Sequence, residues 1–148
     1  MAEGRDDHDL FWIEKARWPF RNPQYYLGWM SDSLSPSPYI ALNYAPVEQR
    51  MAAFTKYLDN IPTAIEQIQA NLEVPMPITW LQVGVDSFGG FATYFRDDVP
   101  QVWAGVEDEA LQTAFAEANA RAVAAMEAFT TWLHMWGPVA NCISFSWR

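Results

Sequence analysis

The residues of this sequence that could do acid–base, nucleophilic or metal chemistry are few and scattered. His8 and His134 are the two histidines, and neither has a second histidine within one helical turn, so the His-Glu-x-x-His zinc pattern is missing. Glu127 lies seven residues before His134, too far for the two to hold one metal ion without further ligands. Cys142 is the one cysteine, and no base lies near it in the sequence. The sequence therefore predicts no catalytic residue, no metal site and no cofactor.

The acidic runs and the glycines have structural explanations. Asp97-Asp98 suits a solvated turn, and the three acids at residues 107–109 suit the first turn of a helix, where they complement the helix dipole. Gly84, Gly89 and Gly90 are not followed by the Lys-Ser/Thr of a phosphate-binding loop. We interpret the three glycines as places where two helices approach closely.

An aromatic segment between Trp18 and Tyr44 is the most suggestive cluster. Rings with polar tips could line a ligand groove, and nearby arginines could bind a carboxylate. The commoner alternative is that the rings form a core and an interface, while the arginines pair with Glu14 and Glu48. The candidate ligand-binding residues are Arg17, Arg21, Tyr25, Tyr26, Trp29, Tyr44 and Arg50.

The elements that would position these residues are predicted to be helices. Apolar residues from position 9 to 16 suit a short helix that ends at Trp18-Pro19. Asn22-Pro23 is a start signal, with Asn as the cap and Pro at the first helical position, for a helix reaching about Leu34. The prolines within residues 35–38 forbid its continuation.

Two amphipathic helices are expected to follow Ala45-Pro46. Asn60-Ile61-Pro62 is interpreted as the end of the first and the start of the second, which predicts an αα-hairpin or a kinked pair. Their apolar faces contain Val47, Met51, Phe54 and Leu58, and then Ile61, Ile65, Ile68 and Leu72.

The second half of the sequence predicts two more helices. Thr79 and Gln82 form a capping-box pattern for a helix over residues 80–95, with a strand over residues 81–85 as the lower-ranked alternative. The strongest helical pattern runs from the acids at 107–109 to about residue 136 and stops at Gly137-Pro138. In the tail, residues 139–148, apolar residues alternate as in a short extended segment.

Composition excludes several classes of partner. The chain has 148 residues, the size of one domain, and a formal net charge of −9 with two lysines, so it cannot neutralise the phosphates of a nucleic acid or attach to an anionic membrane surface. No stretch approaches the roughly 18 apolar residues of a membrane span. The acidic N-terminus lacks the basic and apolar regions of a signal peptide. Aromatic residues make up 16%, more than so short a chain easily hides, so we expect a homo-oligomer, most simply a dimer.

Five short segments follow one another along the chain: residues 18–23 (WPFRNP), 25–26 (YY), 43–50 (NYAPVEQR), 61–62 (IP) and 70–72 (ANL) followed by Pro75. In this order they resemble the N-terminal helical half of the bacterial family catalogued as domain of unknown function 885. The likeness covers about residues 10–135. It implies an all-α fold related to zinc peptidases of the gluzincin type, whose members are often exported. Their zinc-binding His-Glu motif lies in a C-terminal half that this sequence lacks, so no catalytic residue is carried over.

The sequence thus predicts a soluble, single-domain, all-α protein: an irregular bundle of five to seven helices with a long C-terminal helix. Residues 1–8 are expected to be disordered. The predicted function is that of a non-catalytic helical domain for assembly or support of a peptidase-like architecture. The alternative is a small-molecule or peptide binding module that uses the aromatic segment. A cytoplasmic location is the default expectation in the absence of a signal peptide.

Overall fold

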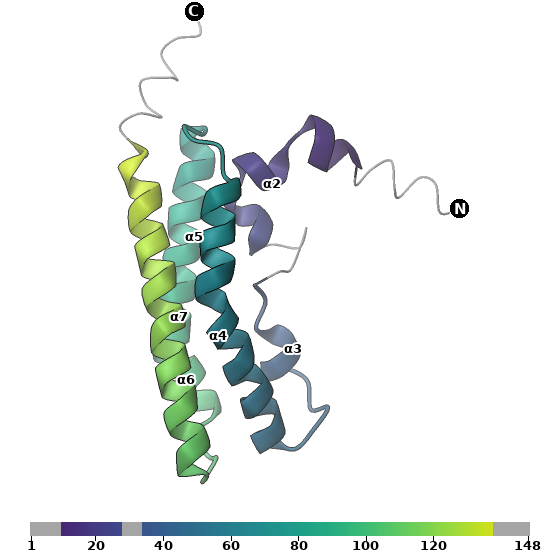
Figure 1. Ribbon diagram of the computed structural model, residues 1–148, viewed down its shortest axis with the longest axis vertical. Helices are drawn as coiled ribbons and strands as arrows, with labels where there is room; N and C mark the ends of the chain where they lie inside the picture. The colour runs from purple at the N-terminus through teal and green to yellow at the C-terminus, as the bar shows by residue number, and fades with distance from the viewer. Residues whose placement is uncertain (1–9, 28–33, 138–148) are drawn as a thin grey trace, which may run out of the picture.

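The computed structural model describes residues 10–27 and 34–137, and in these ranges the chain is helical with no strand (Figure 1). The all-α bundle and its long last helix are therefore confirmed. Three long helices form the bundle: α4 (Val47–Asn71), α5 (Ile78–Asp97) and α7 (Glu109–Met135). The shorter elements are the π-helix η1 (Phe11–Lys15), α2 (Trp18–Arg21), the 3-10 helix η2 (Pro23–Tyr26), α3 (Ser37–Ile40) and α6 (Val99–Val102).

Helix α7 is the element that holds the bundle together, because it packs along both α4 and α5 (Figure 1). Its inner face consists mainly of small and medium-sized apolar residues with Phe129 among them, and that ring meets Phe88 of α5 edge to face, with centroids 4.6 Å apart. An ion pair of 2.6 Å between Arg121 and Asp59 links α7 to α4 on the surface. Exposed ion pairs of this kind add little stability, so burial of the apolar faces is the main force.

Phe54 of α4 lies at the centre of the core, fully buried. Its ring centroid is 6.1 Å from that of Phe95, 5.6 Å from that of Trp103 and 6.3 Å from that of Phe115. The Phe54 side chain thus contacts three parts of the chain: α5, α7 and the turn that follows α6. The composition contains more aromatic surface than so short a chain easily hides. The large rings packed around Phe54 bury much of that surface inside the core.

The expected break at Pro62 is wrong, because α4 continues through it as one helix of 25 residues. The reason is the apolar stripe, whose steps of three and four residues keep the same register on both sides of the proline. Leu58, Ile61 and Ile65 are all buried, so the stripe passes Pro62 without changing face. Burial of this stripe offsets the roughly 3 kcal/mol that a proline costs inside a helix.

The proline signals in the N-terminal part are start signals more often than we expected. Trp18-Pro19 opens α2 and does not end a helix, and the prolines of residues 35–38 open α3. Both corrections have one cause: the first turn of a helix needs no N–H from proline. The Asn22-Pro23 signal is confirmed, since the Asn22 side chain accepts a hydrogen bond of 3.0 Å from the backbone N–H of Gln24. The helix that it opens ends at Tyr26.

Helix α5 begins at Ile78 after Pro77, and no side chain caps it, so the predicted capping box is wrong. Thr79 lies inside the helix, and the strand alternative over residues 81–85 is excluded. The predicted start of α7 is correct to within two residues: of the three acids, Glu109 is in the first turn, Glu107 precedes the helix, and Asp108 caps it by accepting a hydrogen bond of 3.0 Å from the N–H of Leu111. The predictions for residues 1–8 and 139–148 lie outside the described residues.

The glycines of α5 have different surroundings. A Cβ on Gly84 would lie 2.9 Å from Cγ of Pro23 in η2 and 3.2 Å from Cδ1 of Leu133 in α7. A Cβ on Gly89 would make only an ordinary contact, and one on Gly90 would meet nothing within 4 Å. The close approach expected at all three positions therefore occurs at Gly84.

Candidate functional site

Arg17 and Arg21, two of the predicted ligand-binding residues, converge on Glu73 in the loop after α4. Arg17 donates a hydrogen bond to the Glu73 carboxylate, and Nε of Arg21 lies 3.8 Å from the other carboxylate oxygen. Among the described residues, neither Glu14 nor Glu48, the predicted partners, forms an ion pair with these arginines. Beside this pair lies a small hollow of about 200 Å³, lined by Arg21, Glu73, Trp80 and the loop residues 75–77. The single carboxylate of Glu73 thus offsets one of the two arginine charges.

Tyr25 and Tyr26 meet edge to face, with ring centroids 5.3 Å apart. Tyr26 is buried, donates a hydrogen bond of 2.7 Å to the carbonyl of Pro19 and accepts one of 3.4 Å from the Asn71 amide. Burial raises the pKa of the Tyr26 hydroxyl above its ordinary value, while the hydrogen bond from Asn71 acts in the opposite direction. These interactions fix α2 and η2 against the end of α4, so Tyr26 acts as a core residue.

Arg50 lies in the first turn of α4, about 30 Å along the helix from Asn71 at its other end. Its guanidinium donates to the carbonyls of Tyr39 (3.5 Å) and Leu42 (3.4 Å) and lies 5.8 Å from the Trp103 ring centroid. Tyr44, in the preceding loop, is exposed. Arg50 therefore secures the α3–α4 loop.

The seven predicted residues do not form one site. Arg17, Arg21, Tyr25 and Tyr26 gather near the C-terminal end of α4, whereas Tyr44 and Arg50 lie at its N-terminal end. Trp29 lies outside the described residues.

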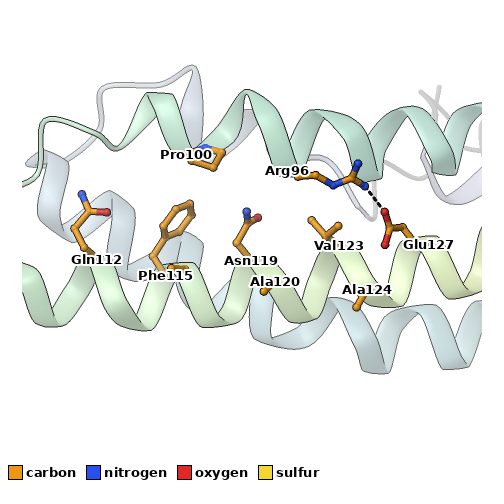
Figure 2. A pocket seen from close by; sticks show the side chains of 10 residues that line it. Arg96, Pro100, Gln112, Phe115, Asn119, Ala120, Val123, Ala124 and Glu127 are labelled. Atoms are coloured by element: carbon orange, nitrogen blue, oxygen red, sulfur yellow. Dashed lines mark hydrogen bonds and ion pairs between the residues drawn. The ribbon is translucent and has the colours of Figure 1, made fainter.

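A groove that the sequence did not predict lies between α7 on one side and the end of α5 with α6 on the other (Figure 2). Its volume is about 430 Å³, which is within the usual range for small-molecule sites. The residues that line it are Arg96, Pro100, Gln112, Phe115, Ala116, Asn119, Ala120, Val123, Ala124 and Glu127.

Asn119 is the polar residue at the middle of this groove. Figure 2 shows its side chain between Phe115 and Val123, directed towards the α5–α6 side. It is 6% exposed, and its Nδ2 donates a hydrogen bond of 2.7 Å to the carbonyl of Phe95. Its Oδ1 is buried and accepts no hydrogen bond from the described part of the chain. Buried amide oxygens without a donor are uncommon in folded proteins.

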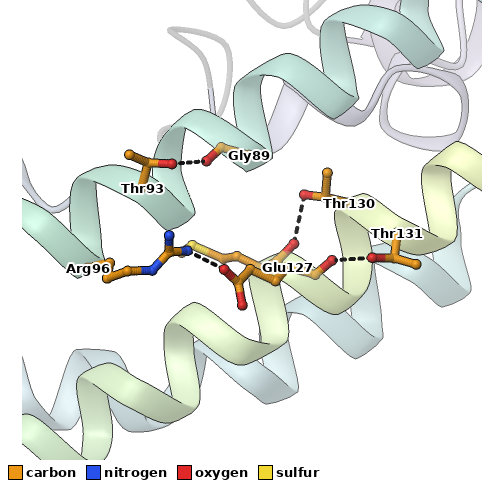
Figure 3. A network of polar contacts seen from close by, with 7 residues as sticks. Gly89, Thr93, Arg96, Glu127, Thr130 and Thr131 are labelled. Carbon is orange, nitrogen blue, oxygen red and sulfur yellow. Dashed lines mark hydrogen bonds and ion pairs between the residues drawn. The ribbon is translucent and has the colours of Figure 1, made fainter.

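The two ends of the groove are polar. At one end, Nε2 of Gln112 donates to the carbonyls of Trp103 (2.7 Å) and Val106 (3.0 Å). At the other end, an ion pair between Arg96 of α5 and Glu127 of α7 bridges the helices (Figure 3). Both side chains of the pair are about half exposed, so they shape the rim and contribute little stability.

The hydroxyls near that ion pair are satisfied within their own helices. Thr93, Thr130 and Thr131 each donate to the carbonyl four residues earlier, at 2.8 to 3.0 Å (Figure 3). A threonine bonded in this way keeps its hydroxyl hydrogen within its own helix, while its oxygen can still accept a hydrogen bond.

Residues 10–27 and 34–137 contain no group of three or more His, Cys, Asp or Glu side chains placed to hold a metal ion. His134 is exposed in the last turn of α7. Within the same ranges, none of the helices combines the length and apolar character that crossing a membrane requires.

Comparison of the chain with models of known protein families, with curated proteins and with solved structures found no match. The relationship to the domain of unknown function 885 family stays a prediction from the sequence.

Proposed function

We propose that this protein is a non-catalytic helical domain whose role is assembly, and that it forms a homodimer. The observation that supports the proposal is an apolar surface on the N-terminal segment. Leu10, Phe11 and Ile13 are 48%, 51% and 44% exposed on and beside η1, which packs against α2. Figure 1 shows this segment extending away from the three-helix bundle.

From the sequence alone, the interface is expected on the long helix between Leu111 and Trp136 or in the tail around Phe145 and Trp147, and the tail lies outside the described residues. The N-terminal surface is a better candidate than the outer face of α7. The exposed positions of α7 carry mainly alanine, threonine and charged residues, with Met135 as the exposed large hydrophobic residue. Three large apolar side chains within four residues offer more area to a partner. Each is already about half buried, so burial of the rest would contribute about 0.7–1.5 kcal/mol per side chain.

A second copy is the simplest partner because a two-fold axis buries the segment of each copy at once. A stable dimer should bury more than about 1,000 Å² in total. We expect light scattering to give a mass near twice 16.9 kDa at high micromolar concentration and a lower mass on dilution.

The test compares Leu10→Gln with Leu42→Gln, an equally conservative change at another exposed leucine. The first should weaken the dimer at least about tenfold, since it removes apolar area from both copies, and the second should leave it unchanged. A monomer at every concentration would refute the proposal, as would equal effects of the two variants.

The hollow beside Arg21 and Trp80 favours a second candidate, small-molecule or peptide binding by the aromatic segment. A ligand carboxylate would have to compete with Glu73 for the two arginines. Glu73→Gln should therefore strengthen binding of a simple aromatic carboxylate such as benzoate, and calorimetry would measure it. Unchanged binding, or none in either protein, would exclude this candidate.

A further inference from the structure

We propose that one end of the bundle, called here the acidic end, is a docking surface for a cationic amphipathic peptide segment. The acidic end consists of residues 41–48, at the α3–α4 loop and the start of α4, and residues 97–109, from the end of α5 through α6 to the start of α7. Figure 1 shows both stretches in the lower half of the molecule, away from the N-terminal segment. The hollow beside Arg21 lies at the opposite end of α4.

Arg50 holds the two stretches of the acidic end together. Its guanidinium donates to the carbonyl of Leu42 at 3.4 Å, and its Cζ lies 5.8 Å from the ring centroid of Trp103 in the turn after α6. A further hydrogen bond of 3.5 Å reaches the carbonyl of Tyr39. The α3–α4 loop is therefore fixed at two points beside the α6 turn.

Three large apolar side chains are exposed on the acidic end. Leu42 and Tyr44 are 58% and 56% exposed on the loop, and Val102 of α6 is 43% exposed. Because Arg50 already fixes the loop backbone, a partner that covers Leu42 and Tyr44 does not have to order it first. A surface that is ordered before binding lowers the entropic cost of association.

The same surface is strongly negative. Its two stretches contain six acids, all exposed, and no lysine or arginine. The flanking cations are occupied elsewhere, Arg50 by backbone carbonyls and Arg96 by Glu127, and no acid of the acidic end forms an ion pair with the described part of the chain. The six acids are Glu48, Asp97, Asp98, Glu107, Asp108 and Glu109.

Asp97 and Asp98 are placed where they do not stabilise the fold. Asp97 is the last residue of α5 and Asp98 is its C-cap, a position where the helix dipole disfavours negative charge. Asp98 also precedes α6, but its side chain makes no capping hydrogen bond. Asp108, in contrast, caps α7. Helix stability therefore does not explain the two aspartates, whereas attraction of a cation does.

Charge decides which kind of partner fits the three apolar side chains. Nucleic acids and anionic lipids are repelled, and so is the acidic end of a second copy. A peptide helix with leucines on one face and lysines on the others offers both an apolar stripe and the opposite charge. The acidic end thus differs from the N-terminal segment, whose exposed side chains are proposed to meet a second copy.

A fluorescently labelled peptide of about 14 residues with this Leu/Lys pattern, about 21 Å long as a helix, is a suitable probe. Fluorescence anisotropy with the full chain as titrant should give a Kd of about 100 μM or tighter at low salt. Binding should weaken at least about tenfold when the salt is raised to about 300 mM, because exposed charges are screened. A control peptide with Glu for every Lys should not bind, and one with Ser for every Leu should bind at least about tenfold more weakly.

A pair of variants tests the apolar contact. Leu42→Gln should weaken binding of the Leu/Lys peptide at least about fivefold, because it removes exposed apolar area from the acidic end. Leu10→Gln makes the same change on the N-terminal segment and should leave peptide binding unaltered. Peptide binding does not depend on the dimer, so a monomeric protein would refute the dimer and still bind the peptide.

A second pair tests the charges. Asp97→Asn combined with Asp98→Asn should weaken peptide binding at least about fivefold without lowering the free energy of unfolding. Glu66→Gln combined with Asp86→Asn changes the net charge equally at exposed positions of α4 and α5, and should weaken binding less than about twofold.

Four results would each overturn the proposal. The first is no saturable binding of the Leu/Lys peptide up to about 1 mM protein, the affinity range of a weak contact. The second is an equal loss in the two charge variants, which would show that only net charge matters. The third is full binding to Leu42→Gln. The fourth is a weaker dimer in Leu42→Gln, which would make the acidic end an interface between copies.

Discussion

Exchange of Gly84 for alanine is the most direct test of how the N-terminal segment attaches to the bundle. The added Cβ would lie 2.9 Å from Cγ and 3.0 Å from Cβ of Pro23. Carbon atoms prefer about 3.5–4.0 Å, so the chain must separate η2 from α5 by several tenths of an ångström. The proline ring is stiff, and the Asn22 cap holds it in place.

The expected magnitude follows from two opposing effects. Alanine improves helix propensity by about 1 kcal/mol, whereas overpacking at a rigid contact costs about 1–3 kcal/mol. The displacement of η2 also disturbs the hydrogen bonds of buried Tyr26. We expect Gly84→Ala to lower the free energy of unfolding by about 1–2 kcal/mol.

Gly90→Ala is the matched control, because it makes the same change in the same helix where nothing lies within 4 Å. It should raise the free energy of unfolding by about 0.5–1 kcal/mol. Urea titrations followed by circular dichroism would measure both variants. If Gly84→Ala stabilises the protein as much as Gly90→Ala does, the contact between η2 and α5 is wrong.

Three further predictions concern the core. Pro62→Ala should raise the free energy of unfolding by about 1–3 kcal/mol in a urea titration, because the carbonyl of Leu58 gains a helical hydrogen bond. A lower free energy of unfolding in this variant would mean that α4 needs the proline. Phe54→Ala should cost about 3–5 kcal/mol and Ile65→Ala about 2–5 kcal/mol, and a change under about 0.5 kcal/mol in either would contradict their burial. Since burial raises the pKa of Tyr26, its protonated form stabilises the folded state, and that contribution is lost as pH rises past the ordinary tyrosine value near 10. The free energy of unfolding should therefore fall less steeply from about pH 9 to 11 in Tyr26→Phe than in the unaltered protein, and equal slopes would exclude this origin.

The class of fold was predictable because each long helix carries its own apolar stripe. In α4 the error came from giving Pro62 more weight than the unbroken steps from Leu58 to Ile61 and Ile65. If one helix ended at residue 61 and another began there, the apolar residues after Pro62 would not need to keep the same three- and four-residue spacing. The stripe was the stronger signal, since burial of several large side chains outweighs one missing hydrogen bond.

The groove could not be predicted in the same way. Asn119 is polar and lies between apolar residues of α7, but the sequence does not say which neighbouring helix it faces. Its partner, the carbonyl of Phe95, is 24 residues away. Arg17 and Glu73 are likewise 56 residues apart, so local pairing rules chose the wrong acids. Contacts of this kind depend on how the helices pack together.

Helix α7 comes after α4 and α5 in the sequence, and this order affects how the chain folds during synthesis. Helices α4 and α5 leave the ribosome first, but the face that covers both extends to Leu133. At about 5–20 residues per second, several seconds separate the emergence of Asn71 from that of Leu133. During that interval two apolar stripes are exposed in the nascent chain. Binding of a chaperone at this stage, and release once α7 has emerged, is the expected consequence.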